Sequence, residues 1–119
     1  MIRRPVVIPE DEEAWLSWVV DYATRVARPA WRIYHTRYSK GSHAGFPDLV
    51  MVRPPRLVFV ELKTDSPRSK PTRAQEDWLD DLHLVASLAG RADPEGTCGI
   101  IGVYVWRPAD RPDIERILR

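Results

Sequence analysis

The sequence has few of the features that mark secreted or membrane-spanning chains. Cys98 is its one cysteine, which excludes an internal disulfide and a multi-cysteine zinc site. No apolar run approaches the ~20 residues that a membrane-spanning helix needs. The N-terminal segment MIRRPVVIPEDEE has only a short apolar run between prolines, which is too short for a signal peptide. These absences predict a cytoplasmic protein without a membrane partner.

The sequence has no large excess of positive or negative charge, since its formal net charge is only +1. The charged residues are, however, unevenly distributed along the chain. Acidic residues are missing from the stretch 22–47, which carries Arg25, Arg28, Arg32, Arg37 and Lys40. Between Arg53 and Arg73 six basic residues, Arg68 and Lys70 among them, accompany only two acids. A segregated basic surface suits a nucleic-acid backbone. The solvated face of a small domain explains the same charges equally simply.

A chain of 119 residues with 44% hydrophobic and 29% charged residues is typical of one globular domain. Apolar spacing predicts a first helix after Pro9, with Trp15, Val19, Tyr22 and Val26 on one face, ending at 28–29. A second helix should open at Thr72 and end near Gly90, and its apolar face should carry Trp78, Leu82, Val85 and Ala89. A short last helix is expected over 112–118.

Four strands are expected at 31–36, 48–52, 57–63 and 100–106. The third is apolar on both faces until Glu61, which is typical of a central strand covered on both sides. Helix, three strands, helix, strand and helix therefore follow one another along the chain. This order predicts an α/β fold with a mixed sheet and helices packed on its faces.

The residues that carry chemistry are Asp48 and the pair Glu61 and Lys63. Side chains alternate along a strand, so Glu61 and Lys63 project from the same face. If the strands at 48–52 and 57–63 form a hairpin, Asp48 lies beside Glu61 and the two carboxylates can hold a hard cation such as Mg²⁺. The backbone carbonyl of Leu62 is a further possible oxygen ligand. An ordinary salt bridge between Glu61 and Lys63 is the simpler alternative.

This grouping has the parts that phosphodiester hydrolysis requires. A metal held by carboxylates activates a water and polarises the phosphoryl oxygen. A neighbouring lysine orients that water or stabilises the developing charge. The three residues therefore predict a metal-dependent nuclease. The sequence has no competing catalytic motif, because its histidines lack metal-ligand spacing and it has no phosphate-binding glycine loop.

Four segments in this order, GFPDLVMV, LVFVELKTD, TRAQEDWLDDL and VYVWRPAD, resemble the VRR-NUC group of the PD-(D/E)XK nuclease superfamily. The resemblance is to its small stand-alone members from bacteriophages and bacteria, and it covers nearly the whole chain as one domain, 1–119. It implies a restriction-endonuclease-like αβββαβ core and hydrolysis of DNA with Mg²⁺ or Mn²⁺. It also implies a homodimer that acts on branched DNA. The segment 83–99 is longer than the family pattern leads us to expect.

The resemblance also implies roles for single residues. Asp48 and Glu61 would bind the metal, Lys63 would be catalytic and Gln75 would lie near the site. An acid of the first helix would complete the site, either Glu12 or Glu13. A similar Tyr-His pair near the family's site makes His35 a candidate DNA contact.

Several of these residues have simpler explanations. Thr72 and Gln75 fit a helix capping box, and an acid such as Glu12 stabilises a helix start without binding metal. His35 lies on a predicted strand and is equally a packed or hydrogen-bonded residue. Further candidate DNA contacts lie in loops that are equally ordinary connections: Arg37, Ser39, Lys40, Ser42, Arg68 and Lys70. A catalytically silent DNA-binding module on the same fold, or a protein that is no nuclease, remains the alternative function.

Overall fold

The computed structural model describes residues 11–36, 44–91 and 100–119. The described part begins with helix α1 (Glu12–Asp21), the π-helical turn η1 (Tyr22–Val26), and strands β1 (Arg32–His35), β2 (Leu49–Arg53) and β3 (Arg56–Leu62). Helix α2 (Arg73–Arg91), strand β4 (Ile101–Trp106), the 3₁₀ turn η2 (Pro108–Asp110) and helix α3 (Arg111–Leu118) follow. This confirms the predicted element order. No helix within the described ranges is long and apolar enough to cross a membrane.

The described strands form one four-stranded mixed sheet in the order β1-β2-β3-β4. Strands β1, β2 and β3 pair antiparallel, and the turn between Arg53 and Arg56 closes the hairpin of β2 and β3. Strand β4 pairs parallel with β3, because α2 carries the chain back along the sheet between them. The fold is therefore mixed α+β, and β3 is a central strand as predicted.

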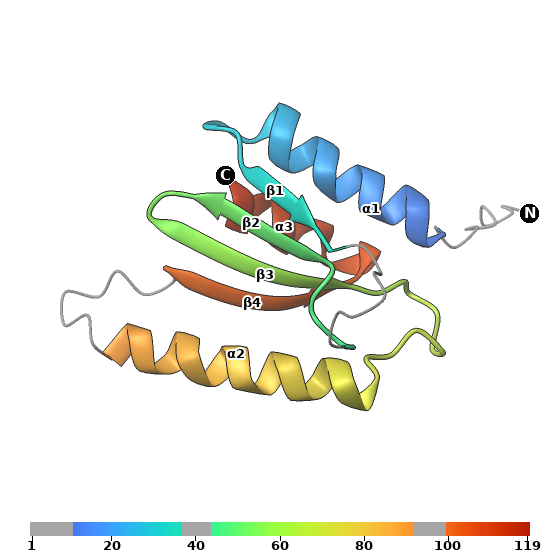
Figure 1. Cartoon of the computed structure of the whole chain (residues 1–119). Helices are drawn as coiled ribbons and strands as arrows, with labels where there is room; N and C mark the ends of the chain where they lie inside the picture. The colour runs from blue at the N-terminus through green and yellow to red at the C-terminus, as the bar shows by residue number, and fades with distance from the viewer. Residues whose placement is uncertain (1–10, 37–43, 92–99) are drawn as a thin grey trace, which may run out of the picture.

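One face of the sheet holds the main core, which α1 and α3 cover (Figure 1). Its buried side chains come from α1, β2, β3, β4, α3 and the connections between them: Trp15, Val19, Ala23, Ala27, Trp31, Leu49, Met51, Val58, Val60, Trp106, Ile114 and Leu118. The indole N–H of Trp15 donates to the carbonyl of Trp106 at 3.2 Å, and that of Trp31 to the carbonyl of Leu118 at 2.9 Å. Both polar groups are thus satisfied inside the core.

Helix α2 lies on the opposite face and runs alongside β4 (Figure 1). Leu79 is buried, and Trp78 makes an edge contact with Phe46, which in turn contacts Phe59 of β3. Within the described residues, the β1 and β2 side of this face lacks a helix cover. Tyr34 of β1 remains 66% exposed and Val52 of β2 36% exposed.

Two residues that were predicted to face the core are exposed, Val26 at 61% and Val85 at 54%. The helix after α1 widens into a π turn, in which the Ala27 N–H donates to the Tyr22 carbonyl five residues back. The extra residue in this turn gives the inward position to Ala27 in place of Val26. On α2 the face that packs against the sheet is centred on Leu79, and Val85 lies outside this face.

Candidate active site

The hairpin of β2 and β3 brings the two predicted carboxylates together. Leu49 pairs with Val60, so Asp48 and Glu61 come next in the register, opposite each other at the end of the sheet. The Asp48 Oδ2 atom accepts a hydrogen bond from the backbone N–H of Leu62 at 2.8 Å. The carboxylate of Asp48 is therefore anchored to the strand that carries Glu61, which confirms the convergence expected from a hairpin.

Glu61 is buried, with only 1% of its surface exposed, and no other charged residue in the described part of the chain is buried to this extent. Its Oε1 atom accepts a hydrogen bond from Gln75 Nε2 at 2.9 Å and faces Lys63 Nζ at 3.4 Å. Its Oε2 atom is buried and has no hydrogen-bond partner among the described residues. Burial and the neighbouring carboxylate of Asp48 raise the pKa of Glu61 to about 7, although Lys63 opposes this shift.

Lys63 directly follows β3 and is held in register with β4. Its backbone N–H donates to the carbonyl of Trp106 at 3.0 Å, the same carbonyl that accepts the indole N–H of Trp15. Only 15% of its side chain is exposed. The ammonium group is thus held beside Glu61 at the wall of the site, and α1, β3 and β4 meet at the carbonyl of Trp106.

Gln75 both caps α2 and contacts a carboxylate of the candidate site. Its Oε1 atom accepts from the Thr72 N–H at 2.8 Å, and its own N–H donates to Thr72 Oγ1 at 3.2 Å, which completes a capping box. Its Nε2 atom donates to Glu61 at the same time. One amide therefore caps α2 and orients a carboxylate of the candidate site.

Gly45 lies in the loop before Asp48, where the sequence left a phosphate contact or an ordinary loop position as alternatives, and the structure gives it a packing role. Its φ of +95° lies in the region that favours glycine, and a Cβ atom there would lie 2.4 Å from the carbonyl carbon of Ala74. Gly45 thus lets the loop before Asp48 approach the first turn of α2, and the next residue, Phe46, packs against Trp78 of the second turn at 5.1 Å between ring centroids. A glycine two residues before Pro-Asp is the sequence signal of this contact.

The site opens into a cavity of about 410 Å³ between the ends of α1, β3 and α2. Its lining includes each residue predicted for catalysis or metal binding, and adds Thr64, which the sequence did not single out: Glu12, Glu13, Trp15, Leu16, His35, Asp48, Glu61, Leu62, Lys63, Thr64 and Gln75. Both Glu12 and Glu13 reach it, so the choice between these acids stays open. His35 is exposed and lines the cavity, so it is not a packed core residue.

Within the described residues, metal binding depends on how closely the side chains that could hold an ion gather in space. No group of three or more His, Cys, Asp or Glu side chains gathers there closely enough to hold an ion. The carboxylates of Glu12 and Glu13 thus both lie in the cavity lining without joining Asp48 and Glu61 in one cluster.

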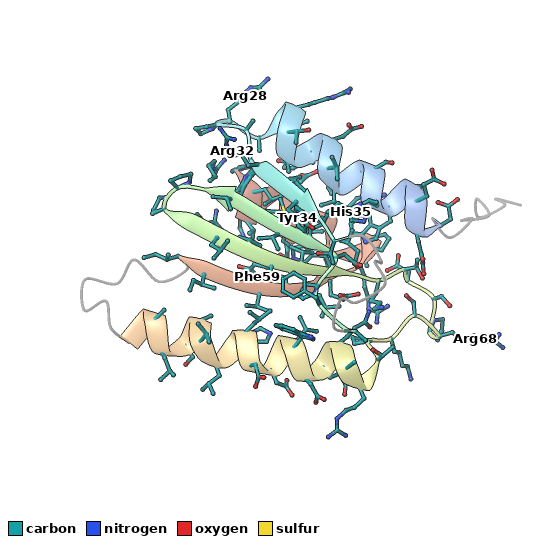
Figure 2. All side chains as sticks on the ribbon, viewed as in Figure 1. Arg28, Arg32, Tyr34, His35, Phe59 and Arg68 are labelled. Carbon is teal, nitrogen blue, oxygen red and sulfur yellow. The ribbon has the colours of Figure 1, made fainter. Side chains whose placement is uncertain are left out.

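The other predicted DNA contacts lie apart from the cavity or outside the described residues. Arg68 and Lys70 are exposed on the loop between β3 and α2, and Arg68 lies at its outer edge (Figure 2). This loop is held by Ser69, whose hydroxyl accepts from the Thr64 N–H at 2.9 Å, and by Arg107, which donates to the Thr64 carbonyl. The predicted contacts Arg37, Ser39, Lys40 and Ser42 fall outside the described residues.

The arrangement gathers two carboxylates, an ammonium and an amide at one cavity, with the carboxylate oxygens that hard divalent cations prefer. An ammonium group at the same wall can neutralise part of the charge of a phosphate. No protein-family model matches this chain, and comparison with curated proteins and with solved structures also gives no match. The chemistry of the site therefore follows from the geometry of the chain's own residues.

Proposed function

We propose that this chain is a divalent-metal-dependent DNA endonuclease of the PD-(D/E)XK type. The observation that carries the proposal is the meeting of Asp48, Glu61 and Lys63 in one cavity. Asp48 follows Pro47, and Lys63 stands two residues after Glu61, as the sequence resemblance requires. The order of helices and strands is compatible with the restriction-endonuclease-like core of that superfamily.

The donor atoms fit Mg²⁺ or Mn²⁺. The Oε2 atom of Glu61 is buried and lacks a hydrogen-bond partner in the described part of the chain, although burying an ionised carboxylate without a partner is costly. A second carboxylate, Asp48, lies close enough to raise the pKa of Glu61. Mg²⁺ commonly uses only one or two carboxylates and takes its remaining ligands from water and substrate phosphates. Asp48 and Glu61 would hold the ion, and Leu62, Glu12 and Glu13 also line the cavity.

A bound Mg²⁺ or Mn²⁺ supplies a water of lowered pKa and polarises the phosphoryl oxygen. The chain's own residues do the rest. The ammonium of Lys63 would donate a hydrogen bond to the attacking water, or would stabilise the negative charge that develops on the phosphate. Gln75 fixes the orientation of the Glu61 carboxylate at 2.9 Å, and the Leu62 N–H fixes that of Asp48 at 2.8 Å. Carboxylates held in this way lose less freedom when a cation binds.

The proposed substrate is DNA, and we propose a homodimer that prefers branched DNA. The acid-free stretch 22–47 offers positive charge for the phosphate backbone. Each chain supplies one Asp48, one Glu61 and one Lys63, so cutting two strands of opposite polarity would need two copies related by a two-fold axis.

The test is a plasmid-nicking assay in Mg²⁺, Mn²⁺, Ca²⁺ and EDTA. We expect nicking in Mg²⁺ and Mn²⁺, none in EDTA, and little in Ca²⁺, which is larger and coordinates more loosely. Lys63→Ala should lower the rate at saturating DNA by about 100-fold or more, the effect of removing one electrostatic stabiliser of the transition state. It should leave the fold and Mg²⁺ binding nearly intact.

Arg116→Ala is the matched control, because Arg116 is exposed on α3 and does not line the cavity. Nicking in EDTA, or a wild-type rate from Lys63→Ala, would exclude the mechanism. DNA binding without cleavage in any of the metals would instead identify a catalytically silent DNA-binding module.

A further inference from the structure

The part of the sheet that lacks a helix cover adjoins the candidate active site. Tyr34 pairs with Val50, and Val50 pairs with Phe59, so these three residues form one row across β1, β2 and β3. Asp48 precedes Val50 by two residues and Glu61 follows Phe59 by two, so the row shares its sheet face with both carboxylates. Two residues along a strand span roughly 7 Å. Tyr34 is therefore an exposed aromatic ring one row from the proposed metal ligands.

The charge beside this row is positive. Arg32 is exposed two residues before Tyr34, on the same face of β1, and Arg28 is exposed in the connection that leads into β1 (Figure 2). The sequence has no acid between Asp21 and Asp48. The acids of α2, in contrast, are exposed on the helix. The surface along β1 thus pairs an aromatic ring with cations, the combination that binds single-stranded nucleic acid.

We propose that Tyr34 is a stacking platform for an unpaired base next to the scissile phosphate, and that the strand being cut is therefore single-stranded at the site. This inference rests on the proposed function and adds its substrate class. A ring in this position can stack only on a base with a free face, whereas both faces of a base inside a duplex are covered by its neighbours. Arg32 would contact the phosphates of the same strand one row farther from the carboxylates.

The experiment compares one fluorescein-labelled oligonucleotide, free and annealed to its complement, as a substrate in Mg²⁺ and as a ligand in Ca²⁺. The wild-type chain should cut and bind the free strand better than the duplex. Tyr34→Ala should lower kcat/KM and affinity for the free strand by about tenfold, the loss expected for one stacked base, and should change the duplex values much less. Tyr34→Phe keeps the ring and should behave like the wild type.

Val52→Ala is the matched control, because Val52 is exposed on the same sheet face, one row beyond Tyr34 from the carboxylates. Circular dichroism checks that each variant is folded. A wild-type chain that does not favour the free strand, or a Tyr34→Ala variant with unchanged discrimination, overturns the stacking role. A change of oligomeric state in Tyr34→Ala by light scattering, with single-strand affinity unchanged, also overturns it and makes this face a contact between copies.

The two proposals fail in different ways. If the wild type nicks DNA in Mg²⁺ and Tyr34→Ala favours the free strand over the duplex as strongly as the wild type does, the stacking role is wrong but the proposed nuclease function is supported. If the chain binds the free strand through Tyr34 but cuts in none of the metals, the nuclease fails and the single-strand site stands.

Discussion

Glu61 is one buried side chain whose protonation links pH to the stability of the fold. In the metal-free protein its pKa is raised to about 7 from an ordinary value of 4.5, with burial as the largest cause and Asp48 as the second. The folded chain therefore holds this proton more tightly than the unfolded chain. The stabilisation is complete below about pH 4.5 and is lost as the pH rises through about 7.

We predict that in EDTA the wild type loses on the order of 3 kcal/mol of unfolding free energy, relative to Glu61→Gln, between acidic pH and pH 8. The glutamine is neutral throughout, so it avoids the cost of burying an ionised carboxylate. Mg²⁺ should reduce the difference at pH 8, because a cation favours the ionised form. Urea denaturation at a series of pH values measures this. Glu76→Gln, at an exposed position of α2, is the control and should follow the wild type.

A second prediction at the residue scale separates the two roles of Gln75. Thr72→Ala removes a capping hydroxyl and should cost about 1 kcal/mol of stability while leaving the contact between Gln75 and Glu61 in place. Gln75→Ala removes the side-chain cap and that contact together, so it should cost at least as much stability and also lower kcat. Chemical denaturation and the nicking assay measure the two effects. Equal kcat in both variants would restrict Gln75 to capping.

At the scale of secondary-structure elements, the site depends on how closely the loop before β2 approaches α2. The loop is held by Gly45 against the first turn of α2 and by Phe46 against Phe59 and Trp78. It leads directly into Asp48, while the same turn of α2 carries Gln75. The relative position of β2 and α2 therefore sets how Asp48 and Gln75 meet at Glu61.

Gly45→Ala should disturb both the fold and the site. The new methyl group would overlap the backbone of Ala74, and alanine disfavours a φ of +95°, so we expect a loss of roughly 1–3 kcal/mol. Mg²⁺ affinity and cleavage should fall as the loop moves away from α2. Thermal denaturation and metal titration measure these effects. Ala44→Ser, at the exposed neighbouring position, should change neither, and a Gly45→Ala variant of wild-type stability would contradict the close approach.

At the scale of the whole molecule, the proposed homodimer needs an apolar surface that is free in one chain. Leu84, Val85 and Leu88 are exposed together on α2, and their spacing places them along neighbouring turns of the helix. A strip of this kind can pair with its own copy across a two-fold axis. We therefore predict a dimer by light scattering at micromolar concentration, and a monomer for Leu88→Lys.

Val26→Lys is the matched control, because Val26 is an equally exposed apolar residue on η1. The dimer should prefer a four-way junction to a linear duplex in a competition assay, and Leu88→Lys should lose this preference while still nicking. Binding should weaken steeply as salt increases, because phosphate contacts release counterions. A wild-type monomer that binds both DNAs equally would leave a nicking nuclease without branch preference.

Much of the fold follows from local patterns in the sequence. Strand alternation, helical spacing and proline positions determined the element order, the central place of β3 and the hairpin that joins β2 to β3. These features depend on the period of side chains along the backbone, which a sequence displays directly. The meeting of Asp48 with Glu61 was predictable for the same reason, because an antiparallel hairpin aligns the start of one strand with the end of the next.

What only the tertiary structure decided concerns contacts between segments far apart in the chain. The hydrogen bond from Gln75 to Glu61, the contact of Gly45 with Ala74 and the exposure of Val85 depend on where α2 lies over the sheet. The exposure of Tyr34 depends on how far α2 extends across that face. Helical spacing shows which side chains share a face, but only packing against other elements determines which of them are buried.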